Sequence, residues 1–338
     1  MSEHDDVLLE VKNLKTYFAL DEGTLKALDD VSFEIRKNRV LGVVGESGCG
    51  KSVTAQSIMQ IVPKPGTVSG EILWHGSDGE VIDIGQLDVE GEQMRQIRGN
   101  EIAMIFQEPM TAFSPVHTIG NQLTESYFVH GKHNKAEARK RAIELLEDVG
   151  IPAADRRIDE YTFQLSGGMR QRAMIAMAMM NQPQLLIADE PTTALDVTIQ
   201  AQILRLMKRL QREFGMAIMF ITHDLGVIAN MADDVAVMYR GKMVEFGTVR
   251  QVLKAPKHPY TKALLRSIPN FSLDKQRLEA IQGTVGMPLD PPNECPYNNR
   301  CDVATPECFV AMPETTRFAD GHCVACYRYT DIEEGTLE

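Results

Sequence analysis

The segment Leu165–Arg172, with the sequence LSGGMRQR, constrains the fold of this chain more than any other stretch. Its Ser-Gly-Gly turn stands where a helix begins, and glycines without a Cβ let backbone amides approach a phosphate closely. The apolar run Leu185–Glu190 (LLIADE) follows and ends in two acidic residues. A buried parallel strand that ends in carboxylates, close to a glycine turn, predicts an α/β fold that binds a phosphorylated ligand.

A second glycine-rich segment lies far upstream at Gly45–Ser52 (GESGCGKS) and matches the phosphate-loop pattern G-x-x-x-x-G-K-[ST]. Gly48 and Gly50 allow a turn whose N–H groups point at the β- and γ-phosphates. Lys51 adds a full positive charge, and the Ser52 hydroxyl is a typical magnesium ligand. Because an apolar strand precedes the loop and a helix follows it, the three segments together predict a nucleoside triphosphatase.

Length and composition predict a soluble protein with one large domain and an appendage. The chain has 338 residues, of which 43% are hydrophobic and 24% charged, as in ordinary globular proteins. No apolar run approaches the roughly 18 residues that a membrane-spanning helix needs, and the acidic start is unlike a signal peptide. A net charge of −12 argues against non-specific binding to nucleic acid. We therefore expect a cytosolic chain that meets a membrane through a partner.

The pattern of apolar residues predicts strands and helices in alternation, with a helical insertion. Strands are expected in 7–45 with a turn at 21–23, and a helix over 51–62 is expected to stop at Pro63 and Pro65. A helical insertion is expected within 118–157. The further expected elements are strands at 102–106, 185–188, 216–222 and 235–239, and a helix at 198–215.

Polar residues at the ends of these strands are candidates for catalysis. Asp189 could hold magnesium, and Glu190 could polarise the attacking water. His223 follows the strand expected beside the one that carries Glu190, so its ring could reach the γ-phosphate. Gln107 similarly ends the strand at 102–106.

In this order, the motifs resemble those of the ATP-binding subunits of ABC transporters, and in particular of oligopeptide, dipeptide and nickel importers. The resemblance covers essentially the whole chain, including 187–204 and 258–265, which look like the peptide-importer branch. Thr193 stands where the D-loop of the family usually has serine. The corresponding motifs are Walker A at 45–52, the Q-loop at Gln107, the signature at 165–172, Walker B at 185–190, the D-loop at 193–196 and the switch region at 221–224.

The resemblance implies an ABC-type fold with a RecA-like phosphate-loop core, an antiparallel β subdomain, an α-helical subdomain at about 110–175 and a small Cys-rich C-terminal domain. The implied division is 1–255 for the nucleotide-binding domain and 256–338 for the C-terminal Pro/Cys-rich domain. Among family roles, Glu190 would be the general base and His223 the γ-phosphate sensor. Ser52, Gln107 and Asp189 would hold Mg²⁺. The implied ATP-binding residues are Phe18, Gly45, Glu46, Ser47, Gly48, Cys49, Gly50, Lys51, Ser52, Val53, Leu165, Ser166, Gly167, Gly168 and Asp196.

Phe18 stands where the family has an aromatic residue that stacks on adenine, and the neighbouring Tyr17 is the alternative. The signature of one subunit is expected to close on the ATP of a second ATPase subunit, which in this branch is typically a paralogue. Two transmembrane permease subunits and, indirectly, an extracytoplasmic substrate-binding protein complete the expected assembly at the cytoplasmic face of the membrane. No nucleic-acid partner is expected.

Five of the six cysteines lie near the C-terminus, which in a reducing compartment favours metal binding over disulfides. Cys295, Cys301, Cys308 and Cys326 resemble the four ligands of a [4Fe-4S] cluster that some peptide-importer ATPases carry. Zinc and unliganded thiols remain alternatives, and Cys323 is the additional cysteine.

Three alternatives concern function. The cargo could be di- or oligopeptides, nickel or another small solute, since the ATPase does not select it. A soluble ABC-type ATPase that acts on ribosomes or DNA is disfavoured by the single phosphate loop and the lack of a sustained heptad run. A degenerate regulatory cassette is disfavoured because Glu190 and His223 are both present.

Overall fold

The computed structural model describes residues 6–76, 79–107, 112–131, 134–193, 195–267, 286 and 288–330. Its centre is an eight-stranded sheet with the order β11-β12-β10-β9-β3-β8-β7-β6. Strands β9, β3, β8, β7 and β6 are parallel, whereas β10, β12 and β11 add to one edge in antiparallel pairs. The bounds of these strands are β3 Val40–Val44, β6 Ile102–Ile105, β7 Leu185–Asp189, β8 Ala217–Thr222, β9 Asp234–Tyr239, β10 Lys242–Thr248, β11 Thr315–Arg317 and β12 Cys323–Ala325.

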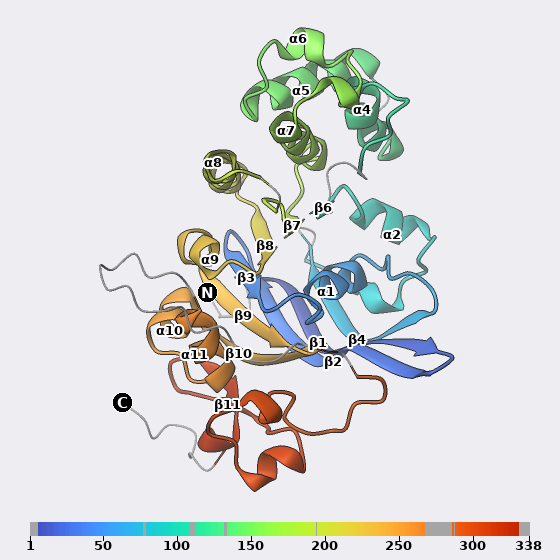
Figure 1. Cartoon of the computed structure of the whole chain (residues 1–338). Coiled ribbons are helices and arrows are strands. Elements are labelled where there is room, and N and C mark those ends of the chain that lie inside the picture. Colours follow the sequence, from blue (N-terminus) through green and yellow to red (C-terminus); the bar gives the residue numbers. More distant parts are fainter. Residues whose placement is uncertain are drawn as a thin grey trace, which may run out of the picture.

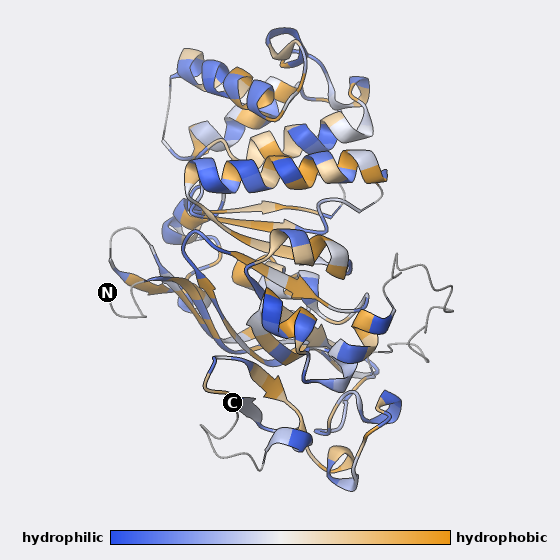
Figure 2. Cartoon of the chain, turned by 90° about the vertical axis from the view of Figure 1, so that its left-hand side faces the viewer, coloured by the Kyte–Doolittle hydropathy of each residue, from blue (hydrophilic) through white to orange (hydrophobic). Residues whose placement is uncertain are grey.

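The parallel strands are predominantly apolar, with polar residues only at their ends, because both faces of the sheet are covered. In β7, Leu186 and Ala188 face one hydrophobic core, and Leu185 and Ile187 face the other. The same alternation holds in β3 and β8. Figure 2 shows these strands as predominantly hydrophobic, while the surrounding helices alternate hydrophobic and hydrophilic residues. The apolar runs at 40–44, 185–189 and 217–222 are therefore strands, as the sequence predicts.

A second sheet of four antiparallel strands, with the order β2-β1-β4-β5, covers one face of the central sheet together with helix α1. Strands β1 Val7–Leu20 and β2 Gly23–Arg36 form the hairpin predicted around residues 21–23. Strands β4 Gly66–His75 and β5 Val81–Asp83 complete the sheet and were not expected from the sequence. Helix α1 spans Lys51–Ile58, so the prediction of a helix to residue 62 is wrong at its C-terminal end.

The other face is covered by helices that include α9 (Leu225–Met231), which contacts β3 and β8. The helices between β6 and β7 form a separate layer at the top of Figure 1. The helices between β6 and β7 confirm the predicted helical insertion, and α8 confirms the helix expected at 198–215, ending at Gly215 with φ +63°. The helices between β6 and β8 are α4 Ile119–Val129, α5 Lys135–Asp148, α6 Ala154–Arg157, α7 Gly167–Ala178 and α8 Val197–Phe214.

The C-terminal segment, of which residues 256–267, 286 and 288–330 are described, is attached to the central sheet by strand pairing. Strand β12 pairs with β10, so the segment continues the sheet beyond the last strand of the preceding part. Figure 1 shows residues 288–330 in orange-red to red, below β10 and at the opposite end of the molecule from the helical layer. Within the described residues no helix is both long and apolar enough to cross a bilayer. The remaining helices are α2 Glu92–Ile97, α9 Leu225–Met231, α10 Val249–Lys254 and α11 Pro259–Arg266.

Candidate functional site

The predicted catalytic residues follow four adjacent parallel strands, β3, β8, β7 and β6, at their carboxyl ends. In open α/β sheets ligands bind at this edge. Strand β3 leads into the phosphate loop, β7 into Glu190, β8 into His223 and β6 towards Gln107. The topology therefore brings together segments that are up to 178 positions apart in the sequence, from Gly45 to His223.

Glycines shape the phosphate loop between β3 and α1. Gly48 and Gly50 have φ values of +79° and +103°, in the region that residues with a Cβ rarely occupy. A Cβ added at Gly50 would stand 2.6 Å from the carbonyl oxygen of Ala27. Gly50 caps α1, whose N-terminus presents free N–H groups to the loop. The local backbone is thus suited to an anion.

Lys51 lies inside the loop and is only 4% exposed. Its ammonium donates hydrogen bonds to the carbonyl oxygens of Gly45 and Glu46, at 2.9 and 3.1 Å. Cys49 is fully buried behind the loop, and burial raises the pKa of its thiol. Ser47 and Gly48 are exposed at the tip of the loop, and Val53 packs against the core from the first turn of α1.

Two of the three predicted magnesium ligands, Ser52 and Asp189, are adjacent. The Ser52 hydroxyl donates to Oδ1 of Asp189 at 3.0 Å. Asp189 is 4% exposed, and burial, reinforced by the neighbouring Glu190, raises the pKa of its carboxyl. A buried carboxylate beside a hydroxyl is a suitable oxygen pair for Mg²⁺, whose positive charge would favour the ionised form of Asp189.

Glu190 is the point on which the other side chains converge. Gln107 Nε2 donates to Oε2 of Glu190 at 3.1 Å, and His223 Nδ1 lies 3.3 Å from Oε1. The Thr193 hydroxyl donates to Oε2 at 2.8 Å. Burial raises the pKa of the Glu190 carboxyl, but the hydrogen bonds from Thr193 and His223 outweigh it and hold that pKa below its ordinary value. Glu190 is therefore a carboxylate at neutral pH, as a general base requires.

The backbone of Glu190 is itself unusual, with φ +46° immediately after strand β7. Non-glycine residues in this region carry strain that the surrounding structure must hold. The Glu190 N–H donates to the Ile221 carbonyl at 3.0 Å, which fixes the turn to the neighbouring strand. The side chain is only 9% exposed, whereas His223 is 54% exposed at the rim of the site.

Thr193 is a site residue that the sequence did not identify as one. Its position in the sequence identifies it only as a D-loop residue, although a hydroxyl three positions after a carboxylate at a strand end can hydrogen-bond back to that carboxylate. Its neighbour Ala194 lies outside the described residues.

The signature turn caps a helix, as predicted. The Ser166 hydroxyl accepts from the Met169 N–H at 3.4 Å, so α7 begins at Gly167. A Cβ at Gly168 would approach the Ile199 side chain to 3.2 Å, which places the start of α7 against the start of α8. Asp196 caps α8 by accepting from the N–H groups of Thr198 and Ile199. Leu165 is buried beneath the turn.

The two candidates for adenine stacking lie near the end of β1. Phe18 is half-buried, and its ring lies close to Gly66 at the start of β4. The Tyr17 hydroxyl instead donates to Asp29, and its ring faces the Lys26 ammonium at 5.5 Å. The Phe18 ring is therefore the better candidate for stacking, because the Tyr17 side chain is held by Asp29 and Lys26.

Four C-terminal cysteines line one pocket, and the fifth does not. Cys295, Cys301, Cys308 and Cys326 share it with His258 and Tyr327. Burial raises the pKa of the Cys295 thiol to about 11, with smaller contributions from the other three thiols. Cys323 lies on β12, and its thiol donates to the Gly321 carbonyl. In the part of the chain that the structure describes, no three His, Cys, Asp or Glu side chains form a group able to hold a metal ion.

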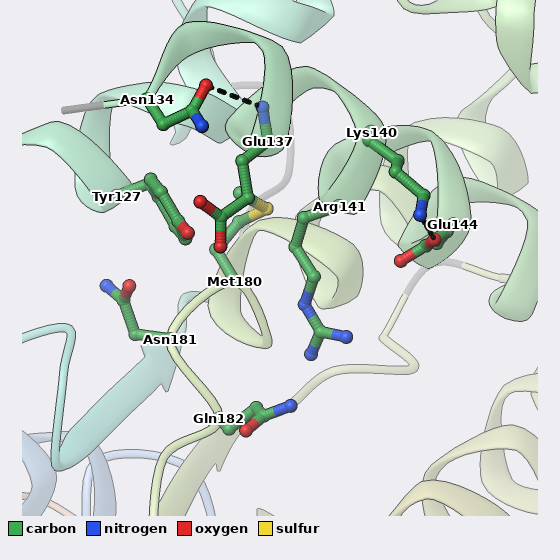
Figure 3. A pocket seen from close by; sticks show the side chains of 9 residues that line it. All are labelled: Tyr127, Asn134, Glu137, Lys140, Arg141, Glu144, Met180, Asn181 and Gln182. Carbon is green, nitrogen blue, oxygen red and sulfur yellow. Dashed lines mark hydrogen bonds and ion pairs between the residues drawn. The ribbon is translucent and has the colours of Figure 1, made fainter. Parts of the chain in front are cut away.

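A different pocket lies in the helical layer and shares no residue with the nucleotide motifs. Figure 3 shows Glu137, Lys140, Arg141 and Glu144 of α5 around it, with Asn181 from the segment after α7. Two acidic and two basic side chains offset each other there, and Lys140 already pairs with Glu144 at 3.8 Å. The pocket therefore shows no preference for a phosphate.

Comparison with known proteins agrees with this geometry. The family model described as ABC transporter matches residues 28–193, and that described as oligopeptide/dipeptide transporter, C-terminal region, matches residues 244–308. A probable peptide ABC transporter ATP-binding protein of Sinorhizobium fredii is 48% identical, over 97% of this chain and 96% of its own length. The dipeptide transport ATP-binding protein DppD of Escherichia coli is 46% identical, over 98% of this chain and 99% of its own.

A solved structure of similar fold is the ATP-binding cassette MJ0796, in a dimeric, post-hydrolysis state bound to ADP and phosphate. It is 27% identical, covers 72% of this chain and 99% of its own, and has a TM-score of 0.62. The predicted ABC fold is thus confirmed, with the RecA-like core, the antiparallel sheet and the helical layer all present. This chain belongs to the ABC transporter family of ATP-binding proteins, in the branch with an oligopeptide/dipeptide transporter C-terminal region.

Proposed function

We propose that this chain is the ATP-hydrolysing subunit of an importer that takes up peptides. The observation that carries the proposal is the convergence of Gln107, Thr193 and His223 on the Glu190 carboxylate, close to the phosphate loop. Relatives named as peptide or dipeptide transport proteins match nearly the whole chain, which supports peptides as the cargo.

Each residue then has a role in hydrolysis. The loop amides and Lys51 bind the β- and γ-phosphates, and Phe18 stacks on the adenine. Ser52, Asp189 and Gln107 would hold Mg²⁺, which would neutralise phosphate charge. Glu190 accepts a proton from the attacking water, while the exposed His223 ring senses the γ-phosphate. The hydrogen bonds on Glu190 keep it ionised and oriented for that transfer.

The signature turn does not join this group of hydrogen bonds, and we assign it to a second cassette. Ser166, Gly167 and Gly168 would close on ATP held by a partner ATPase, which we propose to be a paralogue. The dimeric state of the MJ0796 cassette supports this arrangement. Closure is driven by contacts that exist only in the closed state. Two permease subunits and an extracytoplasmic binding protein would complete the importer, with this chain bound peripherally at the cytoplasmic face.

We also propose that Cys295, Cys301, Cys308 and Cys326 hold a [4Fe-4S] cluster with a structural role. All four line one pocket, whereas Cys323 lies outside it. Four thiolates in one pocket suit either a [4Fe-4S] cluster or tetrahedral zinc. The resemblance of these cysteines to those of peptide-importer ATPases favours the cluster. Burial raises the pKa of the Cys295, Cys301 and Cys326 thiols, and the positive charge of a bound cluster core would offset that effect.

The function is tested by recovering the tagged chain from membranes and measuring uptake in vesicles that contain the recovered complex. We expect two multi-span permeases, a second ATPase and ATP-dependent uptake of labelled di- or oligopeptides. Uptake of Ni²⁺ or another small solute, with no uptake of peptides, would replace the cargo and leave the ATPase role intact. Recovery of ribosomes or DNA without permeases would overturn the transport function.

A further inference from the structure

We infer that Arg300, together with Tyr260, positions the phosphate loop from the C-terminal segment, so that this segment sets the affinity of the chain for ATP. Arg300 directly precedes Cys301, and Tyr260 is the second residue of α11. Both reach Glu46, the second residue of the phosphate loop. The inference rests on the proposed function, because it assigns the loop to ATP.

The ion pair between Arg300 and Glu46 joins residues 254 positions apart in the sequence. One guanidinium nitrogen donates to Oε2 of Glu46 at 2.8 Å, and the other donates to Oε1 at 3.1 Å. The Arg300 side chain is 9% exposed and that of Glu46 27%. A two-point, largely buried pair of this kind fixes orientation as well as distance, unlike a single contact at the surface.

The backbone of Glu46 is held from the same side. Its N–H donates to the Tyr260 hydroxyl at 2.9 Å, and Tyr260 is fully buried. The Tyr260 ring packs against Tyr239, with centroids 4.5 Å apart, and against Tyr297 at 5.3 Å. Tyr239 also accepts from Arg300 at 3.1 Å. The contacts on Glu46 are therefore supported by a packed aromatic cluster and not by flexible side chains.

These contacts bear on ATP through the loop itself. Glu46 supplies one of the two carbonyl oxygens that accept from the Lys51 ammonium, so a shift of Glu46 moves an acceptor of the phosphate-binding lysine. The loop amides must keep their direction to bind phosphate, and small displacements of such preorganised donors are costly. Arg300 and Tyr260 are thus positioning residues that act through Glu46.

The test is a double-mutant cycle on the full-length protein, read out by titration with a fluorescent ATP analogue and by steady-state hydrolysis. Arg300→Ala and Glu46→Gln should each weaken nucleotide binding by about tenfold, and the double variant should be no weaker than either. Arg300→Ala should raise the KM for ATP more than it lowers kcat, and Arg300→Lys should restore part of the affinity. Arg317→Ala removes an exposed arginine of the same segment and serves as the control.

Unchanged affinity in both single variants, or additive losses in the double variant, would overturn the inference. If Arg300→Ala does not fold or loses iron, Glu46→Gln decides, because it removes the partner charge without altering the C-terminal segment. Tyr260→Phe adds an independent check, with a weaker loss expected than for Arg300→Ala. A wild-type protein that binds no nucleotide would refute the proposed ATPase function and would be recognised before any variant is compared.

Discussion

The nucleotide site and the cysteine pocket are built in different ways. The nucleotide site takes its residues from the ends of buried apolar strands, so the large core of the central sheet determines where Asp189, Glu190 and His223 lie. The cysteine pocket packs against the edge of this core through Cys295, Tyr297 and Cys308, but its backbone consists of short turns and a two-stranded extension of the sheet. A changed side chain in the nucleotide site should therefore reduce ATP hydrolysis with little effect on folding. A changed side chain in the cysteine pocket should reduce the stability of the fold.

The largest effect on chemistry is expected from Glu190→Gln. The amide cannot accept the proton of the attacking water, so phosphate release should fall by at least about 100-fold. ATP binding and iron content should remain, because the phosphate loop and the cysteine pocket are unchanged. Phosphate release measures turnover, and light scattering detects the ATP-stabilised dimer that is expected when ATP binds but is not hydrolysed. Ordinary turnover in this variant would show that Glu190 is not the general base.

The converse effect is expected from Cys308→Ser, which removes one thiolate from the pocket. Bound iron and its visible absorbance should be lost, and the midpoint of thermal unfolding should fall by about 5 °C. ATP affinity should fall by no more than in Arg300→Ala, because Arg300 would be loosened but still present. Iron analysis, calorimetry and nucleotide titration check these outcomes.

Cys323→Ser is the matched control, since Cys323 lies on β12 outside the pocket. If Cys323→Ser loses iron as readily as Cys308→Ser, the assignment of ligands is wrong. If anaerobically purified wild type contains stoichiometric zinc and no iron, the cluster itself is rejected.

Glu245→Gln tests the contact between strand β10 and the C-terminal segment. Glu245 of β10 is fully buried, lies 2.7 Å from His322 Nε2 and accepts from the N–H groups of Lys257 and His258. Burial raises the pKa of its carboxyl, but these hydrogen bonds, led by that of His322, lower it below the ordinary value of 4.5. Breaking such a buried network should cost about 3 kcal/mol of unfolding free energy at neutral pH.

The Glu245 carboxyl should also make the free energy of unfolding depend on pH. Because folding lowers the pKa of Glu245, its contribution is fully present above about pH 4.5 and is lost as the pH falls below that value. Unfolding measured between pH 7 and 3 should therefore show a steeper acid loss in wild type than in Glu245→Gln. Glu314→Gln, which changes an exposed carboxyl of the same segment, should follow wild type. Parallel curves for wild type and Glu245→Gln would contradict the prediction.

The smallest effect is expected from Phe18→Ala, at the edge of the nucleotide site. Loss of stacking should cost about 1 kcal/mol, a roughly fivefold rise in the Kd for ATP, with little change in kcat. Tyr17→Ala is the comparison, and a larger loss of affinity there would assign the adenine to Tyr17. Nucleotide titration of both variants separates the two residues.

The sequence predicted the central strands and the site residues that follow them, because in a parallel sheet the local apolar pattern of each strand also determines which distant residues lie close together. Short apolar runs at 40–44, 185–189 and 217–222 are typical of strands covered on both faces, and the residues after such strands meet at one edge of a parallel sheet. The helix α1 is shorter than expected because Gln60, with φ +50°, already leaves the helical conformation before the prolines.

Other parts of the structure could not be predicted, because no local sequence pattern indicates them. Strand β4 begins with polar and glycine residues and is half exposed, so alternation alone did not identify it. The bond between Glu46 and Arg300 joins distant parts of the chain, and neither residue is unusual in its own segment. The predicted division of the chain at residue 255 stays a prediction, since strand pairing of β12 with β10 runs across it.

The pairing of β12 with β10 has a consequence for truncated forms of the protein. Without residues 315–325, β10 would be the outermost strand, and its backbone N–H and C=O groups would face solvent along one side. Exposed strand edges of this kind recruit other chains, so a cassette cut at residue 255 should self-associate through that edge. The terminal segment thus also acts as a cover that keeps neighbouring molecules from adding strands to the sheet.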